Sequence, residues 1–344
     1  MKFNRIAASL MSILDPDNPS ADDPIKYLLV IDEKLLVFKK NGIYEIISAD
    51  SIDPERNHQN TRPTYLKLFS IGTEASIVAR LVIQFDPMLE LVKALPKSNI
   101  SFDELKKQIW EANKLLLECE NAYFGIYKDV MELLPKCDEV VEKSKTANYI
   151  PALPQVQDLE GKASRFFSCA KKFLITTFGI FELFFDMPHF GSKFDKSVGW
   201  LSVKLGDEST LVKMLNDDLS WIKIISECRN ALEHPKNNYC VSFKNFHMKA
   251  GNLFSLPTWS YDLTFSQGMS KLDSDFDLIK DFQVHLENLL TFHEQVVLLC
   301  LESLQGFEDM FVIYHIKESE IDNECPVFYK ISISEKKLNT MGEG

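Results

Sequence analysis

The sequence predicts a mainly α-helical fold: a helical bundle with small antiparallel β-hairpin additions near both termini. Two observations lead to this prediction. Apolar residues recur at three- and four-residue spacing through most of residues 73–305, which is the period of an amphipathic helix. The flanking residues instead contain short β-branched and aromatic runs separated by turn residues, which are typical of hairpins. We therefore expect three regions: 1–72 with the first hairpin, 73–305 as the helical domain, and 306–344 with a second hairpin and a tail.

The N-terminal region is expected to hold a short arm and a small sheet. Residues 1–14 combine two basic residues with a short apolar run, but they lack a small-residue cleavage site and run into acidic residues. This pattern indicates a short helix or arm of a cytoplasmic protein rather than a signal peptide. Segments 35–40 and 43–48 flank Asn41-Gly42, the strongest short-range hairpin signal, and segment 27–31 can add a third strand.

Five segments after residue 73 have the helical period, four of them long. Ser101 and Glu104 form a capping box before the longest one. Pro87 is expected to stop the first helix and Pro135 the second, because proline lacks the N–H that a helix interior needs. The expected helices cover 75–85 with a further turn or two at 88–95, then 102–134, 159–185, 208–234 and 275–304, with a loop at 187–199. The number of long helices fits a bundle.

The remaining expected elements are two strand pairs. Segments 239–248 and 253–263 alternate loosely around a turn, so we expect a hairpin inserted between the last two helices, at about 239–263. Segments 310–316 and 327–334 are expected to pair as the C-terminal hairpin. The segment 166–185 contains seven phenylalanines, which indicates a central or interface helix.

Composition excludes several classes of function. The net charge of −12 disfavours a protein that binds nucleic acid along its whole surface. It is compatible with a local positive groove and with a basic protein partner. The apolar run at 173–185 is too short for a membrane span. The seven cysteines are odd in number and form no C-x-x-C pair, which favours free thiols in a reducing cytosol. Metal, P-loop, serine-elbow and dinucleotide motifs are not matched, so we expect neither a metal nor a cofactor.

The segment Glu227–Pro235 carries the main functional signal, because it places Arg229, Asn230 and His234 where a long amphipathic helix ends. Side chains four residues apart stack on a helix, so Asn230 is expected to hydrogen-bond the His234 imidazole and fix its tautomer. Pro235 disfavours helical geometry for the residue before it, so the helix should end at or just before His234. A helix C-terminus favours a cation, which would help to keep His234 protonated.

These residues resemble the signature of the HEPN superfamily, in which an Arg, often followed by Asn, precedes a His after four to six residues. The resemblance covers a short motif. It implies an all-helical domain built on a four-helix bundle and a dimeric, metal-independent endoribonuclease of the kind found in toxin–antitoxin and antiviral defence systems. It also implies an RNA substrate, a homodimer that brings two motifs together, and an antitoxin or regulatory protein as a further partner.

The chemistry expected of such a site assigns a role to each motif residue. When a ribose 2′-hydroxyl attacks the adjacent phosphate, His234 is the candidate for proton transfer and Arg229 for stabilising the phosphorane charge. Asn230 would orient His234 or contact the phosphate. Substrate contacts are expected from three residues near the inserted hairpin: Lys236, Tyr239 and Lys244.

Two alternatives stay open at this point. In the first, Arg229 pairs with Glu233 on a solvated face, and His234 with Pro235 simply terminates the helix. In the second, the chain is a non-catalytic HEPN-fold scaffold or RNA-binding module.

Overall fold

The computed structural model describes residues 24–32, 34–58, 60–61, 63–95, 100–144, 152–251, 253–266, 269, 271 and 275–334. The chain forms two compact units, which divide at 113/114 and at 300/301. Unit 1 contains both ends of the chain, and unit 2 contains residues 114–300. Sequence analysis instead treated the two ends as separate regions, with boundaries at 72/73 and 305/306. The arm expected at 1–14 and the tail beyond residue 334 lie outside the described residues.

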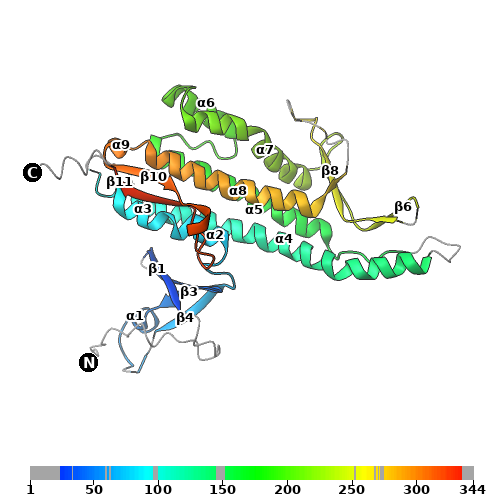
Figure 1. Cartoon of the computed structure of the whole chain (residues 1–344), viewed down its shortest axis with the longest axis horizontal. Helices are drawn as coiled ribbons and strands as arrows, with labels where there is room; N and C mark the ends of the chain where they lie inside the picture. Colours follow the sequence, from blue (N-terminus) through cyan, green and yellow to red (C-terminus); the bar gives the residue numbers. More distant parts are fainter. Residues whose placement is uncertain are drawn as a thin grey trace, which may run out of the picture. The chain divides into compact units, whose positions relative to one another are not determined.

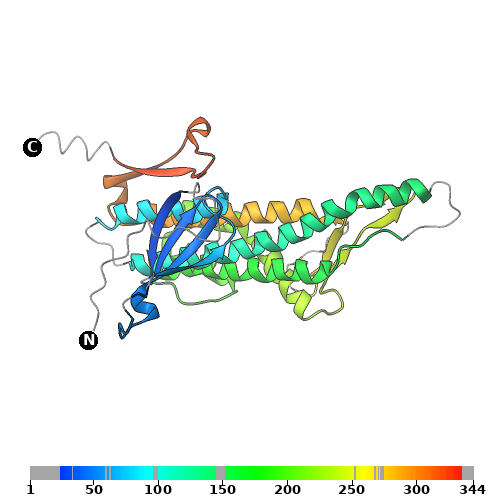
Figure 2. The same ribbon diagram turned by 90° about the horizontal axis from the view of Figure 1, so that it is seen from below.

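Unit 1 contains a four-stranded antiparallel sheet, seen as blue strands in Figure 2. The predicted hairpin and third strand are confirmed, although the two-residue loop is Lys40-Asn41, one residue earlier than expected, because Lys39 pairs with Gly42. The edge strand β4 was missed because its residues are half-exposed or exposed and carry no clear alternation. The strands, in sheet order, are β1 (Ile25–Ile31), β2 (Lys34–Lys39), β3 (Gly42–Ile47) and β4 (Thr64–Phe69), with a short helix α1 (Ala49–Ile52) before β4.

The first predicted helix does not stop at Pro87, which corrects the expectation. The segment runs through α2 (Ser76–Val78), a π-helical turn η2 (Ala79–Ile83) and α3 (Phe85–Val92). The Gln84 N–H donates to the Ala79 carbonyl, a bond that spans five residues and resets the hydrogen-bond register. Pro87 is therefore the third residue of α3, directly after the π-helical turn, and the first turn of a helix is where proline is tolerated.

The C-terminal hairpin belongs to unit 1 and is confirmed as β10 (Phe311–His315) paired with β11 (Tyr329–Ile333). It follows a short helix, α9 (Phe307–Met310), and encloses a single 3₁₀ turn, η3 (Glu318–Glu320). The side-chain oxygen of Gln84 accepts hydrogen bonds from the N–H groups of Phe328 and Tyr329, at 2.6 and 2.8 Å. Segments from the two ends of the chain are therefore held together inside one unit.

Unit 2 is built around a helical bundle. Its members are the part of α4 (Phe102–Ser144) from residue 114, α5 (Leu159–Phe185), α7 (Thr210–Glu233) and α8 (Leu278–Glu302) as far as residue 300 (Figure 1). Aromatic contacts join the helices: Phe166 stacks on Phe282 at 4.2 Å, and Trp221 meets Phe292 edge-on at 5.8 Å. The predicted bounds of α5 are confirmed, and those of α7 and α8 differ by a few residues.

The Phe-rich helix α5 is the centre of this bundle. Five of its seven phenylalanines, Phe166, Phe167, Phe173, Phe178 and Phe181, are at most 2% exposed. Most of its phenylalanine surface is thus buried. Helix α6 (Phe194–Leu205) lies where a loop was expected and packs against α7. It was missed because it is short and places only a few side chains in the core, among them Phe194, which contacts Phe178.

Helix α4 continues through Pro135 to Ser144, which corrects its predicted end at residue 134. Pro135 removes the hydrogen bond to the carbonyl of Met131, four residues earlier. Both residues are exposed, so water can take the place of the lost donor. The cost of the proline is thereby small enough for the helix to continue.

The inserted hairpin is confirmed, but it is divided into two ladders. Strand β5 (Cys240–Lys244) pairs with β8 (Thr258–Asp262), and β6 (His247–Lys249) pairs with β7 (Leu253–Ser255). Strand β9 (Phe276–Asp277) adds to β8. The ladder is interrupted near Asn245, whose side chain hydrogen-bonds both the N–H and the carbonyl of Val156, and near Pro257, which has no N–H to donate.

The structure confirms a mainly α-helical class with small antiparallel sheets. In the part of the chain that the structure describes, no helix has the length and apolar character needed to cross a bilayer.

Candidate functional site at the end of helix α7

Helix α7 ends where the sequence predicted. His234 caps it with φ −134° and ψ 61°, outside the helical region, and its N–H still donates to the Asn230 carbonyl at 2.9 Å. Pro235 follows directly and explains why the helix cannot continue. Arg229 and Asn230 therefore lie in the last turns, and the exposed His234 lies at the cap.

Arg229 forms an ion pair with Glu233 across one helical turn, with the guanidinium nitrogen 2.5 Å from the carboxylate oxygen. The two side chains are 30% and 42% exposed. Pairs of this kind at exposed positions typically contribute less than about 1 kcal/mol, so an incoming anion can compete for the guanidinium. This pair is the one that the alternative interpretation of the motif expects.

Asn230 does not hydrogen-bond His234 as the i,i+4 spacing suggested. Its side-chain oxygen accepts a 2.7 Å hydrogen bond from the Lys171 ammonium, and its amide nitrogen donates to Glu227 at 3.3 Å. The physical reason is the backbone of His234, because stacking of residues four apart requires both to have helical geometry. At the cap, His234 no longer has the helical geometry that would stack it on Asn230.

Lys171, from α5, is the residue that sequence analysis missed. It is 9% exposed, and its ammonium hydrogen-bonds a neutral amide oxygen. Burial and then the charge of Arg229 lower the pKa of Lys171, while Glu227 and Glu233 act in the opposite direction. Its position carried a signal, because Lys171 falls on the buried face of α5 between Phe167 and Leu174. A lysine at a core position of an apolar helix indicates a specific partner.

Glu227 gathers the polar side chains beside the motif. The hydroxyls of Tyr239 and Ser266 both donate to one of its oxygens, at 2.6 and 2.9 Å, and its other oxygen accepts from Asn230. Burial and then the hydrogen bond to Glu227 raise the pKa of Tyr239 above its usual value of 10.0. Tyr239 therefore stays a neutral hydrogen-bond donor at physiological pH.

The three expected substrate-contacting residues have different surroundings. Lys236 and Tyr239 lie in the turn after α7, where their backbones pair with each other and the Lys236 ammonium lies 4.7 Å from the Phe265 ring centre. Tyr239 is buried and joins the network of Glu227. Lys244 lies at the other end of β5 and pairs with Asp275 at 2.6 Å. The structure thus brings Tyr239 to the motif and gives Lys244 a separate partner.

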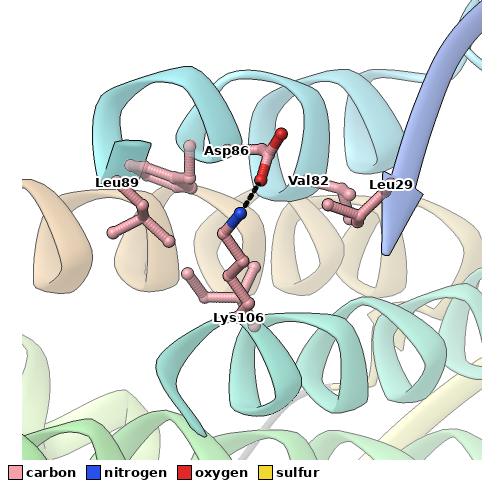
Figure 3. A pocket seen from close by; sticks show the side chains of 7 residues that line it. Leu29, Val82, Asp86, Leu89 and Lys106 are labelled. Atoms are coloured by element: carbon pink, nitrogen blue, oxygen red, sulfur yellow. Dashed lines mark ion pairs between the residues drawn. The ribbon is translucent and has the colours of Figure 1, made fainter. Parts of the chain in front are cut away.

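A second polar cluster lies in unit 1, where Asp86 and Lys106 form an ion pair at 2.5 Å among apolar side chains (Figure 3). The Tyr27 hydroxyl donates to Asp86, also at 2.5 Å, and Glu90 accepts from Lys106. Burial alone would lower the pKa of Lys106, but its hydrogen bonds to Asp86 and Glu90 outweigh that effect and raise it. The charges of this pocket satisfy one another, which is typical of a structural ion pair.

No family model, curated protein or solved structure matches the chain. The site therefore has to be judged on its geometry. Among the described residues, no group of three or more His, Cys, Asp or Glu side chains is arranged to hold a metal ion. Around the end of α7 the structure brings together Lys171 of α5 and Arg229, the carboxylates of Glu227 and Glu233, an amide, a phenol and an exposed imidazole.

Proposed function

We propose that the chain is a HEPN-like endoribonuclease that cleaves RNA without a metal, as a toxin or antiviral defence effector. The observation that carries the proposal is the position of the motif. Helix α7 ends at His234, so an exposed imidazole lies next to a turn that bears Arg229 and, through Asn230, the buried Lys171. A helical bundle that holds Lys171, Arg229 and one imidazole near a helix end, beside Glu227 and Glu233, offers the cations and the proton-transfer group that phosphate chemistry needs.

The proposed reaction needs proton transfer and charge stabilisation. The ribose 2′-oxygen loses its proton and forms a bond to the adjacent phosphorus, while the bond from phosphorus to the 5′-oxygen breaks and that oxygen gains a proton. The products are a 2′,3′-cyclic phosphate and a 5′-hydroxyl end. His234 would move one of these protons, and Arg229 would hold the non-bridging phosphate oxygens with its fork of donors.

The contacts of Asn230 favour a different task from the one that the sequence suggested. Because its oxygen holds the Lys171 ammonium at 2.7 Å, Asn230 positions a second cation beside Arg229. A phosphate at the helix end would then be bound by two positive groups. It would also displace Glu233 from Arg229, which makes Glu233 a competitor of the substrate.

One helix end supplies one histidine, whereas the reaction moves two protons. We therefore include a homodimer in the proposal, in which two copies of the motif face one cleft. The acidic charge of the chain, −12, also suits a basic antitoxin or regulatory protein. The alternative function is a non-catalytic scaffold or RNA-binding module of the same fold. It is favoured by the ion pair and hydrogen bonds that already occupy Arg229 and Asn230.

The test is cleavage of total RNA in EDTA by the wild type and by Arg229→Ala and His234→Ala. We expect cleavage by the wild type and its loss in both variants, with melting temperatures nearly unchanged, because side chains at an exposed helix end usually contribute within about ±0.5 kcal/mol. His189→Ala is the matched control, since His189 is an exposed histidine paired with Glu182. An oligonucleotide with a single 2′-deoxyribose should resist cleavage at that position.

Two outcomes would decide against the proposal. Wild-type protein that leaves every RNA intact, alone and with the products of its neighbouring genes, would favour the scaffold. Cleavage that persists in both variants would keep the activity but assign it to other residues.

A further inference from the structure

Cys119 of helix α4 lies close to the turn of helix α5 that carries Cys169. The buried Cys119 sulfur lies 3.7 Å from the carbonyl oxygen of Phe166. Phe166 precedes Cys169 by three residues, so the two share one face of α5. An ion pair also joins the two helices, between Glu118 and Arg165, the residues directly before Cys119 and Phe166. Cys119 and Cys169 therefore occupy the same level of the helix pair.

The two thiols differ in environment. Cys119 is fully buried, and burial raises its pKa. Cys169 is half-buried, and its interaction with the Cys119 thiol is the largest cause that lowers its pKa, from 9.0 to about 7. Burial and Glu118 oppose this shift, while Arg165 and Lys172 support it. Since the thiolate is the reactive form, one cysteine is accessible and nucleophilic and its neighbour is shielded.

We propose that Cys169 and Cys119 form a peroxide-reactive pair that closes into a disulfide between α4 and α5. The Cys169 thiolate attacks one oxygen of hydrogen peroxide, the O–O bond breaks, and the leaving hydroxide takes a proton to become water. Cys169 is then a sulfenic acid. The Cys119 sulfur attacks the Cys169 sulfur, the S–S bond forms and the S–O bond breaks. The departing hydroxide takes the Cys119 proton as a second water, so peroxide is reduced and the two thiols are oxidised.

This modification is independent of the proposed ribonuclease activity, but it acts on an element of the same unit. Cys169 precedes Lys171 by two residues on α5. A disulfide would fasten this helix to α4, so the oxidised chain should resist thermal unfolding better than the reduced chain.

The first measurement is the alkylation rate of each cysteine in the reduced full-length chain at pH 7, followed by mass spectrometry. Lowering a thiol pKa from 9.0 to about 7 raises its thiolate fraction roughly 50-fold at this pH, while the lower intrinsic nucleophilicity of the thiolate removes roughly eightfold. We expect Cys169 to react roughly five to ten times faster than Cys325, which is also half-buried but whose pKa is raised by burial.

The second measurement maps the products after hydrogen peroxide. Wild type should yield the 119–169 disulfide first, while Cys119→Ser should accumulate a dimedone-trapped sulfenic acid at Cys169. Cys169→Ser should leave Cys119 reduced. The matched control Cys325→Ser should behave as the wild type. Cys119→Ala, which removes the hydrogen-bond donor, should slow alkylation of Cys169, whereas Cys119→Ser, which retains a hydroxyl donor, should slow it less.

The wild-type maps alone can overturn the proposal, even if a variant fails to fold. It is wrong if Cys169 is alkylated no faster than Cys325, or if peroxide oxidises Cys169 to the sulfinic acid while Cys119 stays a thiol.

Discussion

Lys171 shows how a single residue can change the interpretation of a motif. Its ammonium is buried opposite a neutral amide oxygen, and burying a charge without a directly bonded counter-ion is costly. A cation that is already desolvated and fixed in place binds an anion more strongly, so the free energy spent on burying it is recovered when an anion binds. Lys171 is thus the strongest reason to expect a phosphate near Arg229.

We predict that Lys171→Met reduces RNA cleavage by about 10²-fold or more, as expected when one fixed donor to a phosphorane is removed. The melting temperature should stay the same or rise, because methionine fills the space without a buried charge. Gel-resolved cleavage and thermal melts of the same preparations test both parts. Lys172→Met is the control, since Lys172 is its exposed neighbour. A lower melting temperature with full activity would make Lys171 a structural residue.

Glu120 of α4 gives a prediction about pH. Burial raises its pKa from 4.5 to about 7, and its Oε2 is buried without a hydrogen-bond partner among the described residues. Between pH 4.5 and about pH 7, the folded chain therefore keeps a proton on Glu120 that the unfolded chain has already lost. Its contribution to stability is fully present below pH 4.5 and is lost as the pH rises through about 7.

We expect Glu120→Gln, which mimics the protonated acid, to leave stability nearly unchanged at pH 4 and to increase it relative to the wild type as the pH rises to 8. The difference should reach no more than about 3 kcal/mol. Urea unfolding across this pH range measures it, and Glu132→Gln, at an exposed position of the same helix, is the control. A difference that does not vary with pH would show that Glu120 is ionised in the fold.

Elements with a strong period were predictable from sequence, and elements that depend on distant contacts were not. Helices α5, α7 and α8 each bury a continuous apolar stripe, and their predicted bounds lie within a few residues of the observed ones. Strand β4 and helix α6 bury too few side chains to produce such a pattern. The helix expected to end at Pro87 continues because a π-helical turn precedes the proline. The helix expected to end at Pro135 continues because that position is exposed to solvent. Neither cause can be recognised in the local sequence pattern.

The candidate site was likewise predictable from sequence only in part. The position of Arg229, Asn230 and His234 at a helix end followed from spacing and from Pro235. The partners of Asn230 did not, since they depend on the φ and ψ of His234 and on a lysine 59 residues away. Sequence proximity therefore placed the candidate residues at the end of α7 but assigned the wrong partner to Asn230.

At Pro135 we predict that replacement by alanine stabilises the chain, because proline in a helix interior is about 3 kcal/mol less favourable than alanine and the exposed side chain packs little. The gain should be smaller than this figure, since water compensates for part of the lost hydrogen bond. Chemical unfolding and far-ultraviolet circular dichroism test the prediction, with Lys136→Ala as a neighbouring control. Destabilisation would mean that Pro135 contributes more to the fold than its exposed position indicates.

At the scale of the whole molecule, the proposed dimer rests on chemistry alone. The Phe-rich segment was expected to be a central or interface helix, but five of the seven phenylalanines of α5 are at most 2% exposed, so α5 offers little apolar surface for an interface. What remains is the need for two proton-transfer groups at one cleavage site.

We expect light scattering to show a homodimer whose interface includes the end of α7. In mixed dimers of wild-type and His234→Ala subunits, activity should fall more steeply than the fraction of intact subunits. Mixed dimers with His189→Ala subunits should keep full activity. A monomer at all concentrations, or activity proportional to the intact fraction, would contradict the composite site.

The joining of both chain ends in unit 1 has a consequence for how the protein is made. Gln84 emerges from the ribosome before unit 2, but the backbone N–H groups of Phe328 and Tyr329 that it binds emerge after unit 2. At about 5–20 residues per second, synthesis of residues 114–300 alone takes roughly 10–40 s. During that time the nascent N-terminal sheet lacks its C-terminal hairpin, while unit 2, which is continuous in sequence, can fold as soon as it is complete. Vectorial synthesis should therefore finish the interior of the chain first and its two ends last.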